Sequence, residues 1–229
     1  MELTSDALES TGEIEVHKFS IRKKLHLQLL WESSLPSNGL HNLYSLEELV
    51  IMKCPKLQCC STEHLPPQLR KLTVENCREL TTIVDLQSLK SLEVLVIRNC
   101  PVQFAPDEHL PSSLHSLTVT DCKNLQFFPL VDSHELQFGQ DKSLQLMLQN
   151  VHISSCGKLK EVAGLQYLTS LKSLELKKCP LLQIIPDERL LSRPQHVEVT
   201  DCPRLREWCK RHQFHYSQVL SVLHPKNLC

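Results

Sequence analysis

Apolar and polar residues alternate along this chain in a phrase that returns seven times. In its first copy, leucine occupies positions 46 and 49, isoleucine position 51 and cysteine position 54. The later copies end at Cys77, Cys100, Cys122, Cys156, Cys179 and Cys202, at spacings of 23, 23, 22, 34, 23 and 23 residues. A fixed period of about 20 to 50 residues is typical of solenoids, in which each repeat forms one coil.

Inside each copy the constant apolar positions alternate with variable ones, as at 72–74, 95–97, 117–119 and 174–176. A period of two predicts a short β-strand with one face buried and the other exposed. Because no single coil can bury its own leucines, we expect the coils to stack and their strands to form one parallel sheet. A further apolar residue, three positions after most of the cysteines, is expected to turn back into the interior: Leu57, Leu80, Leu125, Leu159, Leu182 and Leu205.

The frame L-x-x-L-x-L-x-x-N/C-x-L is that of the leucine-rich repeat, here with cysteine in place of the commoner asparagine. It predicts an α/β fold, a leucine-rich-repeat solenoid or horseshoe, with a curved parallel sheet on its concave side and an irregular, short-helical convex wall. We expect the seven cysteines to form a buried ladder whose thiols make weak hydrogen bonds to backbone carbonyls of the turn. A redox or metal role for this row is the alternative.

The segments that lead into the strands are of two kinds. Residues 40–46, 86–92 and 165–171 share the form L-x-x-L-x-x-L, which predicts a helical or 3₁₀ turn. The segments at 64–69 and 109–114 contain proline, which predicts an extended or bent connection. Duplication of a two-repeat unit of about 45 residues, the distance from Cys77 to Cys122, explains this alternation.

The repeat divides the chain into three parts. Residues 40–208 carry the solenoid of about seven repeats, with an insertion near 131–145 where one spacing is 34 residues instead of the usual 23. We expect the insertion to form a surface loop, either in contact with a partner or simply tolerated. Residues 1–39 form an atypical N-terminal segment or degraded repeat, and residues 209–229 form a C-terminal cap.

Composition narrows the classes of function. The chain has 229 residues, of which 41% are hydrophobic, and a net charge of -1. This even balance gives no reason to expect nucleic acid or an anionic membrane as the main partner, since binding to either usually requires a basic stripe or patch. Its acidic first 16 residues contain no apolar core of a signal peptide, no stretch approaches 18 apolar residues, and no asparagine begins a glycosylation sequon. These features predict a soluble, cytoplasmic protein.

Cysteine followed by proline and then leucine, at 54–57, 179–182 and 202–205, extends the phrase, and the tails 125–129 and 182–188 repeat one pattern. In these features the chain resembles the C-terminal region of plant nucleotide-binding leucine-rich-repeat (NB-LRR) disease-resistance proteins, over roughly residues 40–208. The resemblance implies effector recognition and autoinhibition in plant defense. The partner would be a pathogen effector, a modified host protein or the receptor's own nucleotide-binding domain. The chain has no P-loop motif, so it would be a receptor fragment, a truncated relative or an isolated repeat domain.

The strand positions that point away from the core vary from coil to coil. Variable side chains on a rigid sheet predict a protein-recognition surface. We call this surface the concave face. Its residues are Val50, Met52, Thr73, Glu75, Val96, Arg98, Thr118, Thr120, His152, Ser154, Glu175, Lys177, Glu198 and Thr200. Val50, Met52 and Val96 are its apolar members, and Arg98 is the expected anchor.

Other chemistry is less well supported by the sequence. Cys202, Cys209, His212 and His215 offer the two thiolates and two imidazoles that zinc accepts, but their spacing is not that of a standard finger. Three further thiols, Cys59, Cys60 and Cys229, have no identifiable base beside them. We therefore expect no catalytic residue, no metal, no cofactor and no small-molecule substrate.

Two other functions are alternatives to protein recognition in immunity. The repeat region of a ubiquitin-ligase adaptor recruits substrates in a similar way, but it requires an F-box-like helical segment, and residues 1–39 offer no convincing one. A non-functional receptor fragment is the second alternative.

Overall fold

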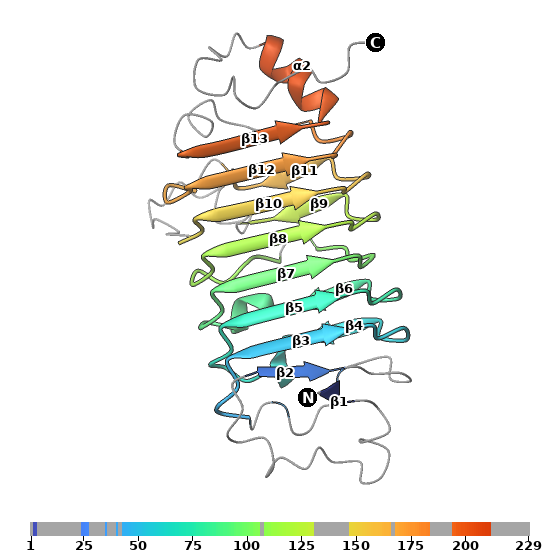
Figure 1. The fold of residues 1–229 in the computed structure, drawn as a ribbon, viewed down its shortest axis with the longest axis vertical. Coiled ribbons are helices and arrows are strands. Elements are labelled where there is room, and N and C mark those ends of the chain that lie inside the picture. The colour runs from blue at the N-terminus through green and yellow to red at the C-terminus, as the bar shows by residue number, and fades with distance from the viewer. Residues whose placement is uncertain are drawn as a thin grey trace.

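The computed structural model describes residues 2–3, 24–27, 35, 40, 43–105, 108–130, 147–165, 168–183 and 194–211. Their coils stack into one column with a nine-stranded parallel sheet along one side (Figure 1), which confirms the predicted leucine-rich-repeat solenoid. In spatial order the strands are β1 (Glu2–Leu3), β2 (Lys24–Leu27), β3 (Glu48–Met52), β5 (Lys71–Glu75), β7 (Val94–Arg98), β8 (Ser116–Thr120), β10 (Asn150–Ser154), β12 (Ser173–Lys177) and β13 (His196–Thr200).

The strands pair with the same phrase positions opposite each other. Leu72 lies opposite Leu49 on one side and Leu95 on the other, and all three side chains are fully buried. The apolar residue three positions after the cysteine is also buried, as predicted, from Leu57 to Leu205. Each coil therefore contributes the same layer of aliphatic side chains to one continuous core, and neighbouring coils bury each other's leucines.

The convex wall contains the predicted tight turns. The backbone N–H of Leu89 donates to the carbonyl of Leu86 at 3.1 Å in the short 3₁₀ helix η4 (Leu86–Ser88). The proline-containing segments bend in the same way, since the N–H of Leu69 donates to the carbonyl of Pro66 at 3.1 Å, just after the 3₁₀ helix η3 (Thr62–His64).

The same wall also contains short strands that the sequence pattern did not predict. β4 (Cys59–Ser61) pairs with β6 (Thr82–Val84), and β9 (Phe127–Pro129) pairs with β11 (Glu161–Ala163), each in parallel. Each of these strands has only three residues, which is too short for an alternating pattern to be recognised in the sequence. The convex wall is therefore hydrogen-bonded between coils in these two places.

Two elements lie near the predicted boundaries at the ends of the column. Strand β2 continues the sheet on the N-terminal side of residue 40, with Leu25 buried opposite Leu49. Helix α2 (Pro203–Arg211) lies beyond β13 and begins inside the range predicted for the last repeat (Figure 1). The predicted insertion at 131–145 and most of the predicted cap, from residue 212 onward, lie outside the described residues. Within the described part of the chain, no helix has the length and apolar character needed to span a membrane.

A residue with left-handed backbone geometry ends the coil's strand segment and directly precedes each ladder cysteine. Asparagine and aspartate tolerate this conformation best among the residues other than glycine. They fill four of the seven positions. The positions, with φ between 49° and 58°, are Lys53, Asn76, Asn99, Asp121, Ser155, Lys178 and Asp201.

These left-handed residues also join successive coils. The N–H of Asn76 donates to the carbonyl of Arg98 at 3.0 Å, and the thiol of Cys100 donates to the same carbonyl at 3.2 Å. The carbonyl of Lys177 likewise accepts from the N–H of Ser155 at 2.9 Å and from the thiol of Cys179 at 3.3 Å. A carbonyl oxygen has two lone pairs, so the thiol satisfies the one that the neighbouring coil leaves open.

Lysine is a poor choice for this left-handed position, so we expect Lys178→Asn to stabilise the protein by about 0.5–1 kcal/mol. The Lys178 side chain is exposed, and the inter-coil bond uses its backbone N–H, which the substitution keeps. Urea unfolding measures the change. The control is Lys160→Asn, an exposed lysine that is not among the residues with positive φ. An equal or smaller gain at position 178 than at position 160 would contradict the backbone explanation.

Candidate functional site

The structure places all seven cysteines of the predicted ladder in the interior, each at most 2% exposed. Each thiol donates to the carbonyl two residues earlier, at 3.2 to 3.5 Å: Cys54, Cys77, Cys100, Cys122, Cys156, Cys179 and Cys202. Several also reach a carbonyl of the preceding coil, as Cys202 does at Leu176, 3.5 Å away. These are the contacts of structural thiols that hold the turn.

Contacts between neighbouring thiols shift their acidity. A side-chain hydrogen bond with Cys100, followed by burial, raises the pKa of Cys77 to about 12. The same hydrogen bond lowers the pKa of Cys100, against the opposing effect of burial. The same kind of contact with Cys122 raises the pKa of Cys156 to about 12. Thiols that are buried and protonated at neutral pH are poor nucleophiles and poor metal ligands.

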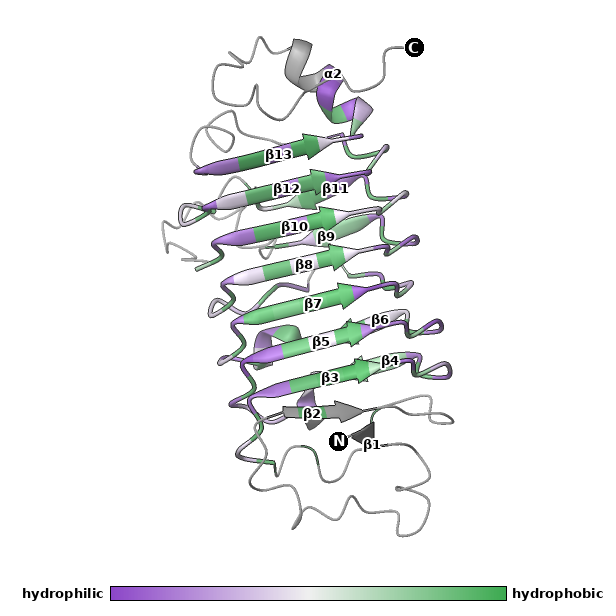
Figure 2. Cartoon of the chain, viewed as in Figure 1, coloured by the Kyte–Doolittle hydropathy of each residue, from purple (hydrophilic) through white to green (hydrophobic). Residues whose placement is uncertain are grey.

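The central row of the concave face is less accessible than the sequence suggests. Val50, Thr73 and Val96 project from the sheet but are only 6 to 8% exposed, so the expectation that they face solvent is wrong. These residues are directly opposite one another on β3, β5 and β7, and their Cβ-branched side chains shield each other. Figure 2 shows that β3 and β7 are apolar along most of their length, whereas hydrophilic residues are prominent on β12 and β13.

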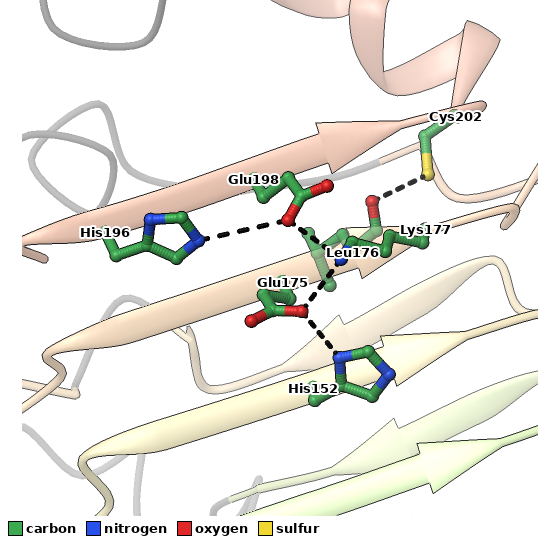
Figure 3. Close-up of polar contacts among 7 residues, drawn as sticks. All are labelled: His152, Glu175, Leu176, Lys177, His196, Glu198 and Cys202. Atoms are coloured by element: carbon green, nitrogen blue, oxygen red, sulfur yellow. Dashed lines mark hydrogen bonds and ion pairs between the residues drawn. The ribbon is translucent and has the colours of Figure 1, made fainter. Parts of the chain in front are cut away.

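Five polar side chains meet at the C-terminal end of the concave face, and we call them the charged network: His152, Glu175, Lys177, His196 and Glu198 (Figure 3). The Lys177 ammonium lies between the two carboxylates, 3.0 Å from Glu175 Oε2 and 2.8 Å from Glu198 Oε2. The Glu175 Oε2 atom also lies 2.9 Å from His152 Nδ1. The network is therefore a set of side chains that orient each other.

The parallel register explains this arrangement. His152, Glu175 and Glu198 are directly opposite one another on β10, β12 and β13, and Lys177 lies two residues further along the same face. Side chains at such cross-strand positions are close enough to interact. The sequence pattern placed these residues on one face, but it did not identify their pairing. His196 was missed, although its position two residues before Glu198 puts it on the same face.

The ion pairs shift two pKa values within the network. The Lys177 ammonium, followed by the His152 imidazole, holds the pKa of Glu175 below its ordinary value of 4.5. Glu198 and then Glu175 raise the pKa of Lys177 above its ordinary value of 10.5. The Glu175 contribution to stability is therefore lost as the pH falls through its lowered pKa. The Lys177 contribution is lost as the pH rises through its raised pKa.

The residues of this face also suggest two other chemical roles, a metal site and an activated hydroxyl. Ligand atoms of Glu175, His196 and Glu198 lie within 4.8 Å of one another, as in a metal site, but both carboxylates are already paired with the Lys177 ammonium. Thr118 is opposite His152, so a hydroxyl, an imidazole and the Glu175 carboxylate form a row. Between the described residues Thr118 and His152 there is no hydrogen bond that would activate the hydroxyl.

The zinc alternative at the C-terminus is only partly visible. Cys202 belongs to the buried ladder, where its thiol donates to the carbonyl of Thr200. It also donates to the carbonyl of Leu176 (Figure 3). The side chain of Cys209, together with His212 and His215, lies outside the described residues.

The sequence matches no known protein-family model, and no curated protein matches it. Two solved structures are similar in outline. The leucine-rich-repeat domain of the type III effector XopL is 18% identical, with 89% of each chain covered and a TM-score of 0.42. An internalin (InlF) from Listeria monocytogenes is 13% identical, with 83% of this chain and 66% of that chain covered and a TM-score of 0.32. Because both TM-scores are below 0.5, the fold assignment rests on the repeat geometry described above.

Proposed function

We propose that this chain is a non-enzymatic protein-binding module that contacts its partner with the concave face. The observation that carries the proposal is the contrast between the two sides of each strand. Inward positions repeat leucine, isoleucine and valine, whereas outward positions carry different chemistry in every coil. A rigid sheet holds these side chains in fixed relative positions, and the charged network adds a preorganised polar patch.

The proposed biological setting is plant innate immunity in the cytoplasm. The support is the resemblance of the Cys-Pro phrase and the proline-containing wall to the repeat region of plant NB-LRR receptors. The proposed partner is a pathogen effector, a host protein modified by one, or the nucleotide-binding domain of the same receptor. In the last case the module would hold the receptor inactive until recognition releases it.

Exchanging the charges at two positions of the network tests the binding surface. The double variant Glu175→Lys with Lys177→Glu keeps the net charge, and it places a lysine opposite Glu198, so we expect stability to change by no more than about 1 kcal/mol. Because charged groups across an interface must be complementary, we expect retention of the bound protein from plant leaf extract to fall at least about tenfold. Quantitative mass spectrometry after affinity capture measures retention.

The control for this experiment is Lys123→Glu, an exposed lysine in the turn that follows Cys122, away from the sheet. We expect it to retain the same proteins as the unmodified chain. Equal retention by the double variant would mean that the concave face is not the binding surface. The immune-receptor assignment has a separate test, the transcript upstream of Met1, which should encode an in-frame P-loop. A stop codon immediately upstream would instead make the chain a stand-alone or relic protein.

A further inference from the structure

The centre of the concave face, over β7, β8 and β10, differs from the zones on either side of it. Every outward residue of β8 carries a hydroxyl: Ser116, Thr118 and Thr120. None of these hydroxyl groups has a hydrogen-bond partner among the described residues, and all three side chains are half-buried. They lie on a rigid strand, and each can donate a hydrogen bond to a partner molecule.

Arg98 borders this hydroxyl row and is the exposed cation at its edge. It lies opposite Thr120 on β8 and opposite Glu75 on β5. Glu75 forms no ion pair with it among the described residues, and the Glu75 carboxylate instead accepts a hydrogen bond from Asn76 Nδ2 at 3.1 Å. Asn76 is held in turn by Asn99 Nδ2, which donates to Asn76 Oδ1 at 2.7 Å. Within the described residues, the guanidinium of Arg98 makes no ion pair and no hydrogen bond.

Two other cations of the concave face are already paired. Glu48 and Lys71 form an ion pair at 2.8 Å at one end, and Lys177 is shared by two carboxylates at the other. Among the described side chains of β3 to β13, Arg98 is a cation that a partner can pair with at no cost to an existing ion pair. An arginine beside hydroxyl donors matches a carboxylate, which accepts several hydrogen bonds and prefers the planar guanidinium fork.

We propose that the central concave face binds an acidic segment of the partner protein, with an aspartate or glutamate carboxylate received by Arg98 and the hydroxyl groups of β8. This inference rests on the proposed protein-binding function and specifies its chemistry. Neighbouring strands are about 4.8 Å apart, so a carboxylate over Thr120 lies within reach of Arg98. Glu75 opposes such a ligand through charge repulsion, and it therefore limits the affinity.

A random-peptide display library, selected on the full chain, tests the proposal. We expect peptides enriched in aspartate and glutamate. A synthetic copy of the most enriched peptide should bind about tenfold or more weakly to Arg98→Ala, as measured by fluorescence anisotropy. Its affinity for Glu75→Gln should increase up to about fivefold, because the repelling charge is removed. The control Arg204→Glu, on the exposed first turn of α2, should select the same peptides as the unmodified chain.

Each alternative outcome has a definite meaning. Peptides without an acidic bias that are nevertheless lost on the exchange at Glu175 and Lys177 would overturn the acidic-segment proposal and leave the protein-binding function standing. Peptides insensitive to all concave-face variants would overturn both. A library that yields no enriched peptide overturns the acidic-segment proposal. So does a phosphorylated peptide that binds more than about tenfold tighter than its glutamate counterpart, because the ligand would then be phosphate.

Discussion

Replacing Phe128 with alanine should lower the free energy of unfolding by about 3–5 kcal/mol, the range for removing a buried aromatic ring. Phe128 lies on β9, is fully buried, and packs edge to face against Phe104 with the ring centroids 4.8 Å apart. The alanine variant loses both the buried area and this ring contact. Urea unfolding followed by circular dichroism measures the loss.

The neighbouring residue provides a matched control. Phe127 lies on the same strand but points the other way and is only half-buried. We expect Phe127→Ala to cost about 1 kcal/mol or less, as for substitutions near a protein surface. Equal losses from the two variants would mean that β9 does not order its side chains as described. A broadened transition for Phe128→Ala would indicate that the coils around β9 unfold separately from the rest.

The rate of thiol labelling should be much lower for the ladder cysteines than for exposed cysteines. We expect each ladder thiol in the native protein to react with iodoacetamide at least about a thousandfold more slowly than in urea, because labelling requires the coil to open. The raised pKa of Cys77, Cys156 and Cys179, about 12 in each case, slows the reaction further. Peptide mass spectrometry at successive times gives a rate for each cysteine.

An adjacent pair on β4 supplies the internal control. Cys59 is partly exposed, whereas Cys60 is fully buried and burial raises its pKa. We expect Cys59 to label rapidly in the native protein and Cys60 to be protected like the ladder. We also expect Cys54 to label faster than Cys122, because coils near the ends have fewer stabilising neighbours. Uniform rapid labelling of the ladder in the native protein would refute its buried position.

The repeat phrase was sufficient to predict the coils. Constant apolar residues at a period of two indicate a strand, and they also identify the face of that strand that is buried. It also predicted the buried residues that follow the cysteines, such as Leu57 and Leu80. The left-handed residues were not predicted, although the recurrence of asparagine or aspartate before Cys77, Cys100, Cys122 and Cys202 is a signal that identifies them in retrospect. Short convex strands such as β4 and β11 left no such signal.

The concave face shows the same division between what the pattern predicts and what it does not. Alternation alone assigned Val96 and Glu175 to one surface, and the structure confirms that both project from it. Accessibility was not predictable, because it depends on the neighbours across the sheet: Thr73 and Thr118 shield Val96, whereas Glu175 stays half-exposed. The ion pairs within the charged network could not be predicted without the register between neighbouring strands. The repeat phrase defines that register only once the strands are known to stack.

A strand carbonyl such as that of Arg98 accepts one hydrogen bond from the cysteine thiol two residues later and another from a backbone N–H of the preceding coil. This arrangement affects how such a chain can change in length. Each coil presents the same hydrogen-bond donors and acceptors to its neighbours. A whole repeat unit can therefore be gained or lost without leaving a buried polar group unpaired. A partial unit must instead leave the stack. Across the 34-residue spacing the stack keeps its register, since Leu117 lies opposite Val151, and the N–H of Asp121 reaches the carbonyl of Ser154 at 3.0 Å. Addition of a whole unit would therefore lengthen the recognition surface by one strand.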